Sequence, residues 1–138
     1  MTATTTTLTL DTPVVWKQGV AASAAAAAAT TALAGIASAG GVSFSDGSGP
    51  GIPTLGFTQL TLVFALVGVA MAAFMQRRAK QPRATFVRTA AVLTALSYVP
   101  DLTFGFDAAS AVTLIALHTV AALIVVPVVA GRLTRTRV

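Results

Sequence analysis

Four long stretches of this sequence are almost free of charged side chains, and this pattern limits the folds that the chain can adopt. They span approximately residues 14–42, 55–75, 85–99 and 108–130. A helix that crosses a bilayer needs about 20 mainly apolar residues, and the second and fourth stretches meet this need directly. The third reaches the required length only if the long side chain of Arg88 extends toward the lipid headgroups. The pattern predicts an all-α membrane protein, a bundle of four transmembrane helices.

Composition supports contact with a lipid bilayer. Of the 138 residues, 55% are hydrophobic and 9% are charged, whereas soluble domains carry roughly 25% charged residues. A chain with so few charges cannot cover a surface that faces water. The absence of cysteine excludes disulfides, thiol catalysis and cysteine metal sites.

The first apolar stretch consists almost entirely of small residues, in the segment GVAASAAAAAATTALAGIASAGG. Small side chains let helix backbones approach closely, so this helix is expected to pack centrally against its neighbours. A cleaved signal peptide is the alternative, with Lys17 as the basic flank and residues 37–39 as the cleavage site. The small residues that recur every four positions are Gly19, Ser23, Ala27, Thr31 and Gly35.

Basic residues are distributed unevenly among the connections. Four lie between the second and third stretches, and Arg88 lies near the start of the third. Lys17 lies near the start of the first stretch, and three basic residues follow the fourth. The charged residues of the other two connections are Asp46, Asp101 and Asp107, and neither connection has a basic residue. Because cytoplasmic loops are enriched in Lys and Arg, both termini are predicted to be cytoplasmic, in a multi-pass protein of the cell membrane. This distribution also explains the formal net charge of +5 without nucleic-acid binding.

The sequence divides into three parts. Residues 1–12 are polar and threonine-rich, and are predicted to form a flexible cytoplasmic tail. Residues 13–131 hold the four-helix transmembrane domain, and residues 132–138 form a basic cytoplasmic tail.

Four segments of the sequence stand out together: GIPTLGF (51–57), RRAKQPRATFVRT (77–89), LSYVPD (96–101) and LHTVAALIVVPVVAGRL (117–133). They resemble a family of small four-helix integral membrane proteins that is common in actinobacteria and has no known function. The resemblance covers nearly the whole chain. It implies four retained helices rather than a cleaved signal. Because the family has no known activity, the resemblance assigns no catalytic role to any residue.

The connection before the fourth stretch, SYVPDLTFGFDAAS (97–110), holds two of the four acidic residues. Pro100 is expected to end the third helix, because proline cannot donate a backbone hydrogen bond. Asp107 is predicted to cap the N-terminus of the fourth helix. Asp101 then falls in a turn, which does not require a charge, so a turn role and a functional role both remain open.

His118 is the only histidine and lies near the middle of the fourth stretch. At about 1.5 Å per residue it lies about 16 Å from Asp107, so neither loop aspartate is expected to contact it. Thr30, Thr31 and Gly68 fall at the same predicted depth. The threonine hydroxyls are expected partners for the imidazole, and Gly68 would leave room for it. His118 is then either a ligand-binding or catalytic group, or a neutral hydrogen-bonding group between helices.

Several kinds of chemistry do not fit the sequence. One histidine without cysteine or glutamate predicts no metal site, and no nucleotide or other cofactor motif is present. Ser97 and Ser110 are expected to lie too far from His118 for a catalytic triad. No predicted spanning segment carries a central carboxylate, unlike the small multidrug exporters, which have a similar length and helix number.

Two classes of function remain. The first is a non-enzymatic bundle, expected to self-associate, that binds a small or lipophilic ligand or supports a membrane partner. The second is a membrane-embedded acid/base enzyme, an isomerase or cyclase acting on a lipophilic substrate. In that enzyme, His118 would move a proton, and Asp101 or Asp107 would hold a cationic centre.

Overall fold

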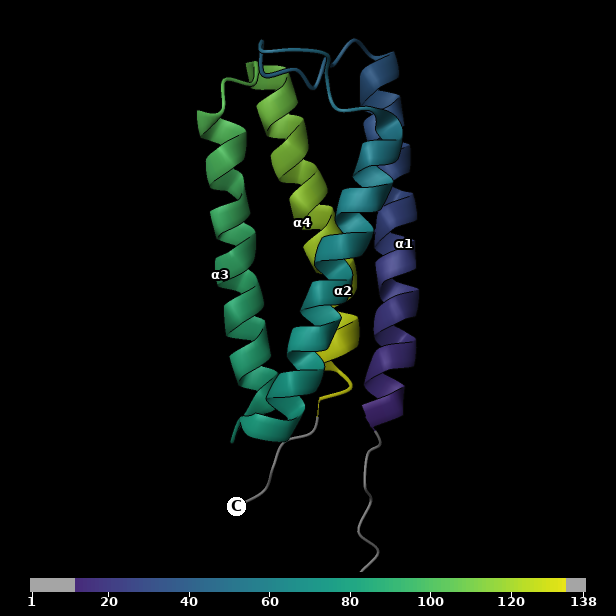
Figure 1. Ribbon diagram of the computed structural model, residues 1–138, viewed down its shortest axis with the longest axis vertical. Helices are drawn as coiled ribbons and strands as arrows, with labels where there is room; N and C mark the ends of the chain where they lie inside the picture. Colours follow the sequence, from purple (N-terminus) through teal and green to yellow (C-terminus); the bar gives the residue numbers. More distant parts are fainter. Residues whose placement is uncertain (1–11, 134–138) are drawn as a thin grey trace, which may run out of the picture.

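A computed structural model describes residues 12–133, with side chains from Val15 onward. It contains four helices, α1 (Thr12–Ala39), α2 (Thr54–Arg78), α3 (Pro82–Thr103) and α4 (Ala108–Ala130), which run alternately up and down (Figure 1). The predicted all-α fold with four helices is therefore confirmed. The two predicted tails lie outside the described residues, except for Thr12, which begins α1, and residues 132–133.

Three of the four helices are long and apolar enough to cross a membrane. These are α1 from Val15 onward, α2 and α4. The third helix, α3, does not reach the same apolarity, although its 22 residues have sufficient length. Its two arginines, Arg83 and Arg88, and its aspartate, Asp101, account for much of the difference.

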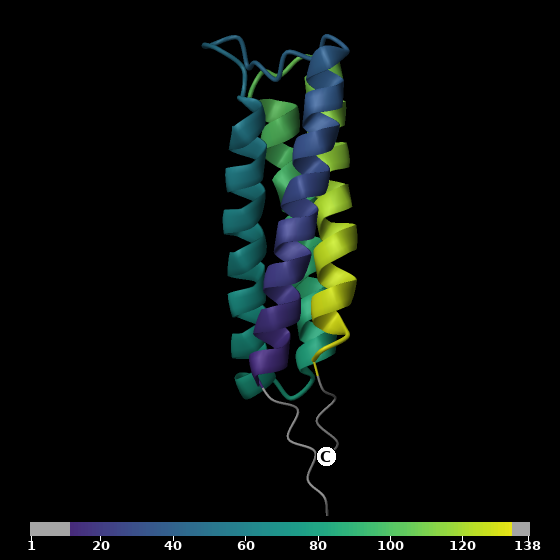
Figure 2. The ribbon, with the colours of Figure 1, turned by 90° about the vertical axis from the view of Figure 1, so that its right-hand side faces the viewer.

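The helices form a bundle in which α2 and α4 each contact all three other helices. In Figure 2, α1 stands between α2 and α4, with α3 behind them. In the described part of the chain, α1 and α3 do not contact each other. As expected, α1 packs closely against its neighbours α2 and α4, but it does not reach α3. One side of α1 is packed, and its other side is exposed, as Ala21, Ala24 and Ala28 show.

The small residues of α1 still bring two helices close together. Gly19, Ser23 and Ala27 are buried. A Cβ atom on Gly19 would lie 2.6 Å from both γ-methyl carbons of Val69 on α2, a residue that is itself fully buried. Only a residue without a side chain leaves room for the valine in this position.

Two hydroxyl pairs also join α1 to α2. Thr30 Oγ1 lies 3.0 Å from Thr61 Oγ1, and Thr31 Oγ1 lies 2.6 Å from Thr58 Oγ1. Hydrogen bonds of this kind link helices that have few other polar groups. The hydroxyls of Thr30 and Thr31 on α1 are therefore already hydrogen-bonded to threonines of α2.

Two apolar cores fill the bundle, one toward each end. The core near the chain termini includes Val15, Val69, Phe86, Val125 and Val129. The core at the opposite end includes Ala34, Phe44, Phe57, Leu114 and Leu117. In this second core, the rings of Phe44 and Phe57 meet edge to face, with centroids 4.9 Å apart.

The segment between α1 and α2 folds over the bundle and crosses above the start of α4 (Figure 1). Phe44, which is buried, donates its backbone N–H to Ser110 Oγ at 3.0 Å. Ser43 Oγ donates to Asp107 Oδ2 at 2.9 Å. A Cβ atom on Gly105 would lie 3.2 Å from the backbone oxygen of Asp46, so the same segment also lies against the α3–α4 connection. We call this segment, residues 40–53, the roof.

The third helix continues past Pro100, contrary to the prediction. It ends at Thr103, and Phe104 N–H donates to the Pro100 carbonyl at 3.0 Å. Proline lacks only the backbone N–H that would bond to the carbonyl four residues earlier. Its own carbonyl still accepts a hydrogen bond, from Phe104, so the helix can continue. Asp101 consequently lies in the last turn of α3 rather than in a loop.

Candidate functional site

Asp101 and His118 come together although they lie at different distances from the ends of their helices. Asp101 is two residues from the end of α3, whereas His118 is ten residues after the start of α4. This corresponds to about 15 Å along α4. The two residues can meet because α3 stops at a lower level than α4 begins, and the connection between them climbs the difference (Figure 1).

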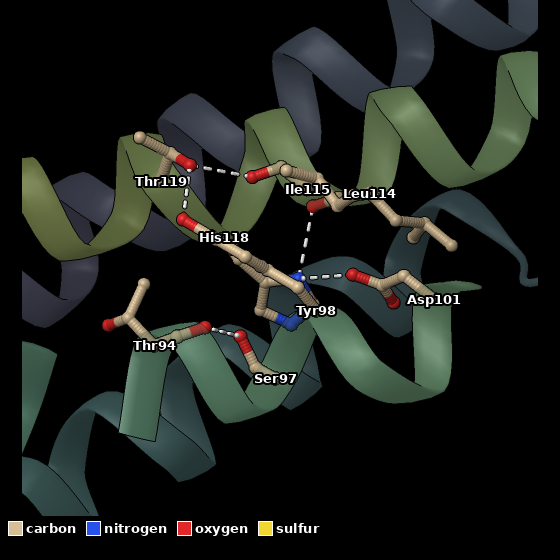
Figure 3. Close-up of polar contacts among 8 residues, drawn as sticks. All are labelled: Thr94, Ser97, Tyr98, Asp101, Leu114, Ile115, His118 and Thr119. Atoms are coloured by element: carbon tan, nitrogen blue, oxygen red, sulfur yellow. Dashed lines mark hydrogen bonds and ion pairs between the residues drawn. The ribbon is translucent and has the colours of Figure 1, made fainter. Parts of the chain in front are cut away.

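The side chains of Asp101 and His118 contact each other between α3 and α4 (Figure 3). His118 Nδ1 lies 3.1 Å from Asp101 Oδ2 and 3.0 Å from the Leu114 carbonyl oxygen. The prediction that no loop aspartate contacts His118 is therefore wrong for Asp101. The prediction fails because it placed the neighbouring ends of α3 and α4 at one level.

The hydrogen on Nδ1 cannot serve both oxygens equally. A backbone carbonyl only accepts hydrogen bonds, so the Leu114 contact assigns the hydrogen to Nδ1. Asp101 Oδ2 then approaches Nδ1 without a hydrogen bond of regular geometry. This oxygen is buried and has no other hydrogen-bond partner among residues 12–133.

The other ring nitrogen of His118 has no partner either. No hydrogen bond involves Nε2 within the described residues, and 42% of the His118 side chain is exposed, against 7% for Asp101. With the hydrogen on Nδ1, Nε2 of the neutral ring is an acceptor. The pair therefore presents acceptor atoms, one of them in a half-exposed ring.

An apolar groove runs along α3 and α4 next to this pair. It has a volume of about 590 Å³ and is open to the side of the bundle. Arg83 lines one end, and Tyr98 and Thr119 line the other, where their hydroxyls are hydrogen-bonded at 2.8 Å. Tyr98 precedes Asp101 by nearly one helical turn (Figure 3). Because Tyr98 lines the groove and neither residue of the pair does, the groove ends just before the pair. The apolar lining includes Val87, Ala91, Ala95, Ala122, Leu123 and Val126.

Asp107 is a helix cap, as predicted, and takes no part in the pair. Its Oδ1 accepts from the Ser110 backbone N–H at 2.9 Å, and its Oδ2 accepts from the hydroxyls of Ser110 and Ser43. These bonds stabilise the charged form and lower the pKa of the Asp107 carboxyl to about 2. On the roof, bonds from Ser48 likewise lower the pKa of Asp46.

The other residues predicted for the site lie elsewhere. Thr30 and Thr31 bond to threonines of α2 rather than to His118. A Cβ atom on Gly68 would meet nothing within 4 Å, so Gly68 does not make room for the imidazole ring. Sequence reasoning missed Tyr98 and Thr119, although the three-residue spacing of Tyr98 and Asp101 places both on one face of α3.

The described residues contain no group of three or more histidine, cysteine, aspartate or glutamate side chains that could hold a metal ion. What the pair can do chemically is accept hydrogen bonds, hold a cationic group at the Asp101 carboxylate, or exchange a proton through the imidazole.

Comparison with known proteins gives a family but no activity. The model of a family of unknown function (DUF6069) matches residues 10–135. No curated protein and no solved structure matches the chain.

Proposed function

We propose that this chain, which belongs to the family of unknown function (DUF6069), is a membrane protein that binds a lipophilic ligand through a polar group held at His118 and Asp101. One observation carries the proposal. A half-exposed imidazole with an unpartnered Nε2 lies beside a buried carboxylate oxygen that also lacks a hydrogen bond. A ligand donor would satisfy the exposed Nε2 beside this carboxylate.

The proposal rests on a topology in which all four helices cross the bilayer and both termini are cytoplasmic. Three helices have the required length and apolarity. In the sequence, the nine basic residues fall near the start of α1, around the connection between α2 and α3, and after α4, and the preference of Lys and Arg for cytoplasmic loops therefore favours this orientation. In this orientation, His118 lies about half-way through a hydrocarbon layer of about 30 Å.

At that depth, unsatisfied polar atoms are costly. Each polar group without a hydrogen bond costs several kcal/mol in hydrocarbon, because no water replaces the missing partner. Since Nε2 of the neutral ring and the Asp101 oxygen are both acceptors, the matching ligand carries a donor. A hydroxyl or an amino group on a lipid-soluble molecule fits this chemistry.

The contact between Asp101 and His118 also favours a second function, that of an acid/base enzyme acting on a lipophilic substrate. A carboxylate 3.1 Å from an imidazole nitrogen can orient the ring and stabilise its charged form while the other nitrogen exchanges a proton. In this case, Asp101 rather than Asp107 is the partner of His118. Conversion of a membrane-extracted lipophile by the wild-type protein, lost in a stable Asp101→Asn variant, would distinguish an enzyme from a binding protein.

The donor requirement can be tested with two matched probes, a pyrene-labelled long-chain alcohol and its methyl ether. In lipid nanodiscs, the wild-type protein should bind the alcohol about two- to tenfold more tightly than the ether, because one net hydrogen bond contributes about 0.5–1.5 kcal/mol. His118→Leu should remove this difference. Thr113→Val is the matched control, since the Thr113 hydroxyl bonds only to its own helix at the Ala109 carbonyl.

Because the chain has one histidine, its imidazole nitrogens can be followed by ¹⁵N NMR without ambiguity. The Nε2 resonance should move when the alcohol is added and should not move with the ether. Equal affinity for the two probes, or a preference that survives in His118→Leu, would refute the proposal. A dimer that dissociates in His118→Leu would instead assign the missing partner to a second copy of the chain.

A further inference from the structure

The groove between α3 and α4 has a polar group at each end and an apolar floor. Its Arg83 end belongs to the first turn of α3, and its far end is closed by the Tyr98–Thr119 hydrogen bond. Arg83 and Tyr98 are fifteen residues apart, which is about 22 Å of helix. One leaflet of a bilayer has a hydrocarbon thickness of about 15 Å. The groove is therefore long enough to hold one acyl chain of a lipid along its whole depth in the leaflet.

No carboxylate among residues 12–133 forms an ion pair with Arg83. Within that range, the one contact between an aspartate and a basic side chain joins Asp101 to His118, and the three described aspartates all lie toward the opposite end of the bundle. Three more basic residues, Arg77, Arg78 and Lys80, precede Arg83 in the same region of the chain. A lipid whose chain lies in the groove would thus meet at its headgroup a positive charge that no carboxylate of residues 12–133 pairs with.

The start of α3 adds to this positive field. Its N-cap residue, Gln81, makes no side-chain capping bond, and Pro82 occupies the first helical position. The N-terminus of a helix carries a partial positive charge. The guanidinium group of Arg83 can also donate two parallel hydrogen bonds to a phosphate. The apolar groove, the exposed guanidinium group and the N-terminus of the helix all favour a molecule with an apolar chain and an anionic head.

We propose that the α3–α4 groove is a binding site for an anionic phospholipid, with one acyl chain along the groove and the phosphate at Arg83. This site is separate from the Asp101–His118 pair, because neither residue of the pair lines the groove. It does not depend on the ligand proposed for that pair.

Native mass spectrometry of the protein released from nanodiscs tests this assignment. The probes are nanodiscs of phosphatidylcholine and phosphatidylglycerol in equal amounts. The wild-type protein should retain phosphatidylglycerol in preference to phosphatidylcholine. Arg83→Gln should reduce this preference by about fivefold, the ratio that corresponds to one arginine near an anionic lipid. Arg88→Gln is the matched control, because it removes the same charge from an exposed residue of α3 that does not line the groove.

A second variant tests the apolar part of the site. Ala91→Phe fills the groove and should reduce retention of both lipids, whereas Ala28→Phe, on the exposed side of α1, should not. Excess inorganic phosphate should leave the retained phosphatidylglycerol in place, because it has no chain to occupy the groove. The proposal is wrong if the wild-type protein shows no preference between the lipids. It is also wrong if Arg88→Gln has the effect of Arg83→Gln, if Ala91→Phe retains lipid normally, or if phosphate alone displaces the lipid.

Discussion

Replacing Gly19 by alanine should destabilise the bundle, although alanine is the better helix former. The added Cβ atom would lie 2.6 Å from both γ-methyl carbons of Val69. Because Val69 is fully buried on α2, it cannot rotate into empty space, and the two helices must move apart. The same substitution at Gly68 meets nothing within 4 Å, so Gly68→Ala is the matched control.

Two opposing free energies set the expected magnitude. Overpacking a close contact costs about 1–3 kcal/mol, whereas replacing glycine by alanine within a helix gains about 1 kcal/mol. Gly19→Ala should therefore be destabilised by about 0–2 kcal/mol, and Gly68→Ala stabilised by up to about 1 kcal/mol. The difference between the two variants, in which helix propensity cancels, isolates the steric cost of about 1–3 kcal/mol.

Equilibrium unfolding in mixed micelles of detergent and sodium dodecyl sulfate gives the free energy of unfolding for each variant. A double-mutant cycle with Val69→Ala completes the test, because removing the valine methyls should make room for the new Cβ atom of Gly19→Ala. The combined variant should then be more stable than the sum of its single changes implies. If Gly19→Ala is as stable as Gly68→Ala, or if the cycle shows no coupling, then α1 and α2 do not approach as closely as described.

Three further predictions follow from the packing, the cap and the proposed topology. Ala27→Leu, at a position only 2% exposed, should lower the free energy of unfolding by about 1–3 kcal/mol, whereas Ala28→Leu, on the exposed side of the same helix, should have little effect in the same assay. The pKa of Asp107 is lowered from 3.8 to about 2, so its charged form stabilises the fold above pH 3.8, and this contribution should be lost as the pH falls toward 2. The variant Asp107→Asn should keep the helix cap, but its thermal unfolding should no longer show that part of the pH dependence. A cysteine introduced at Ser48 should react with a membrane-impermeant maleimide in intact cells, while a reporter fused after Val138 should be cytoplasmic, and the reverse pattern would refute the orientation.

The sequence predicted the helices well where local signals mark their ends. The start of α4 follows Asp107, which accepts a backbone hydrogen bond as an N-cap does, and the predicted range 108–130 agrees with the structure. The end of α2 was placed too early, because hydropathy falls at Arg77 and Arg78 while the helix continues through both. Charge marks the edge of an apolar segment, but it does not end a helix.

The site was harder to predict, because it depends on the relative levels of two helices. Periodicity places Asp101 and Tyr98 on one face of α3, but no local signal states how far α3 is shifted along α4. The shift arises because α3 continues past Pro100 and because the connection after Thr103 runs along the bundle axis before α4 begins (Figure 1). The prediction that hydroxyls would satisfy His118 failed for a related reason, since Thr30 and Thr31 found nearer partners on α2.

The roof determines how a molecule can reach the interior of this protein. It is bonded to the start of α4 through Ser43 and Phe44, and it lies against the α3–α4 connection at Gly105. With that end covered, the exposed edge of His118 opens to the side of the bundle. In the proposed orientation, a ligand therefore dissolves in the bilayer before it binds. Its effective concentration is then set by its partition coefficient between lipid and water, and two ligands with equal contacts at His118 would differ in apparent affinity by the ratio of those coefficients.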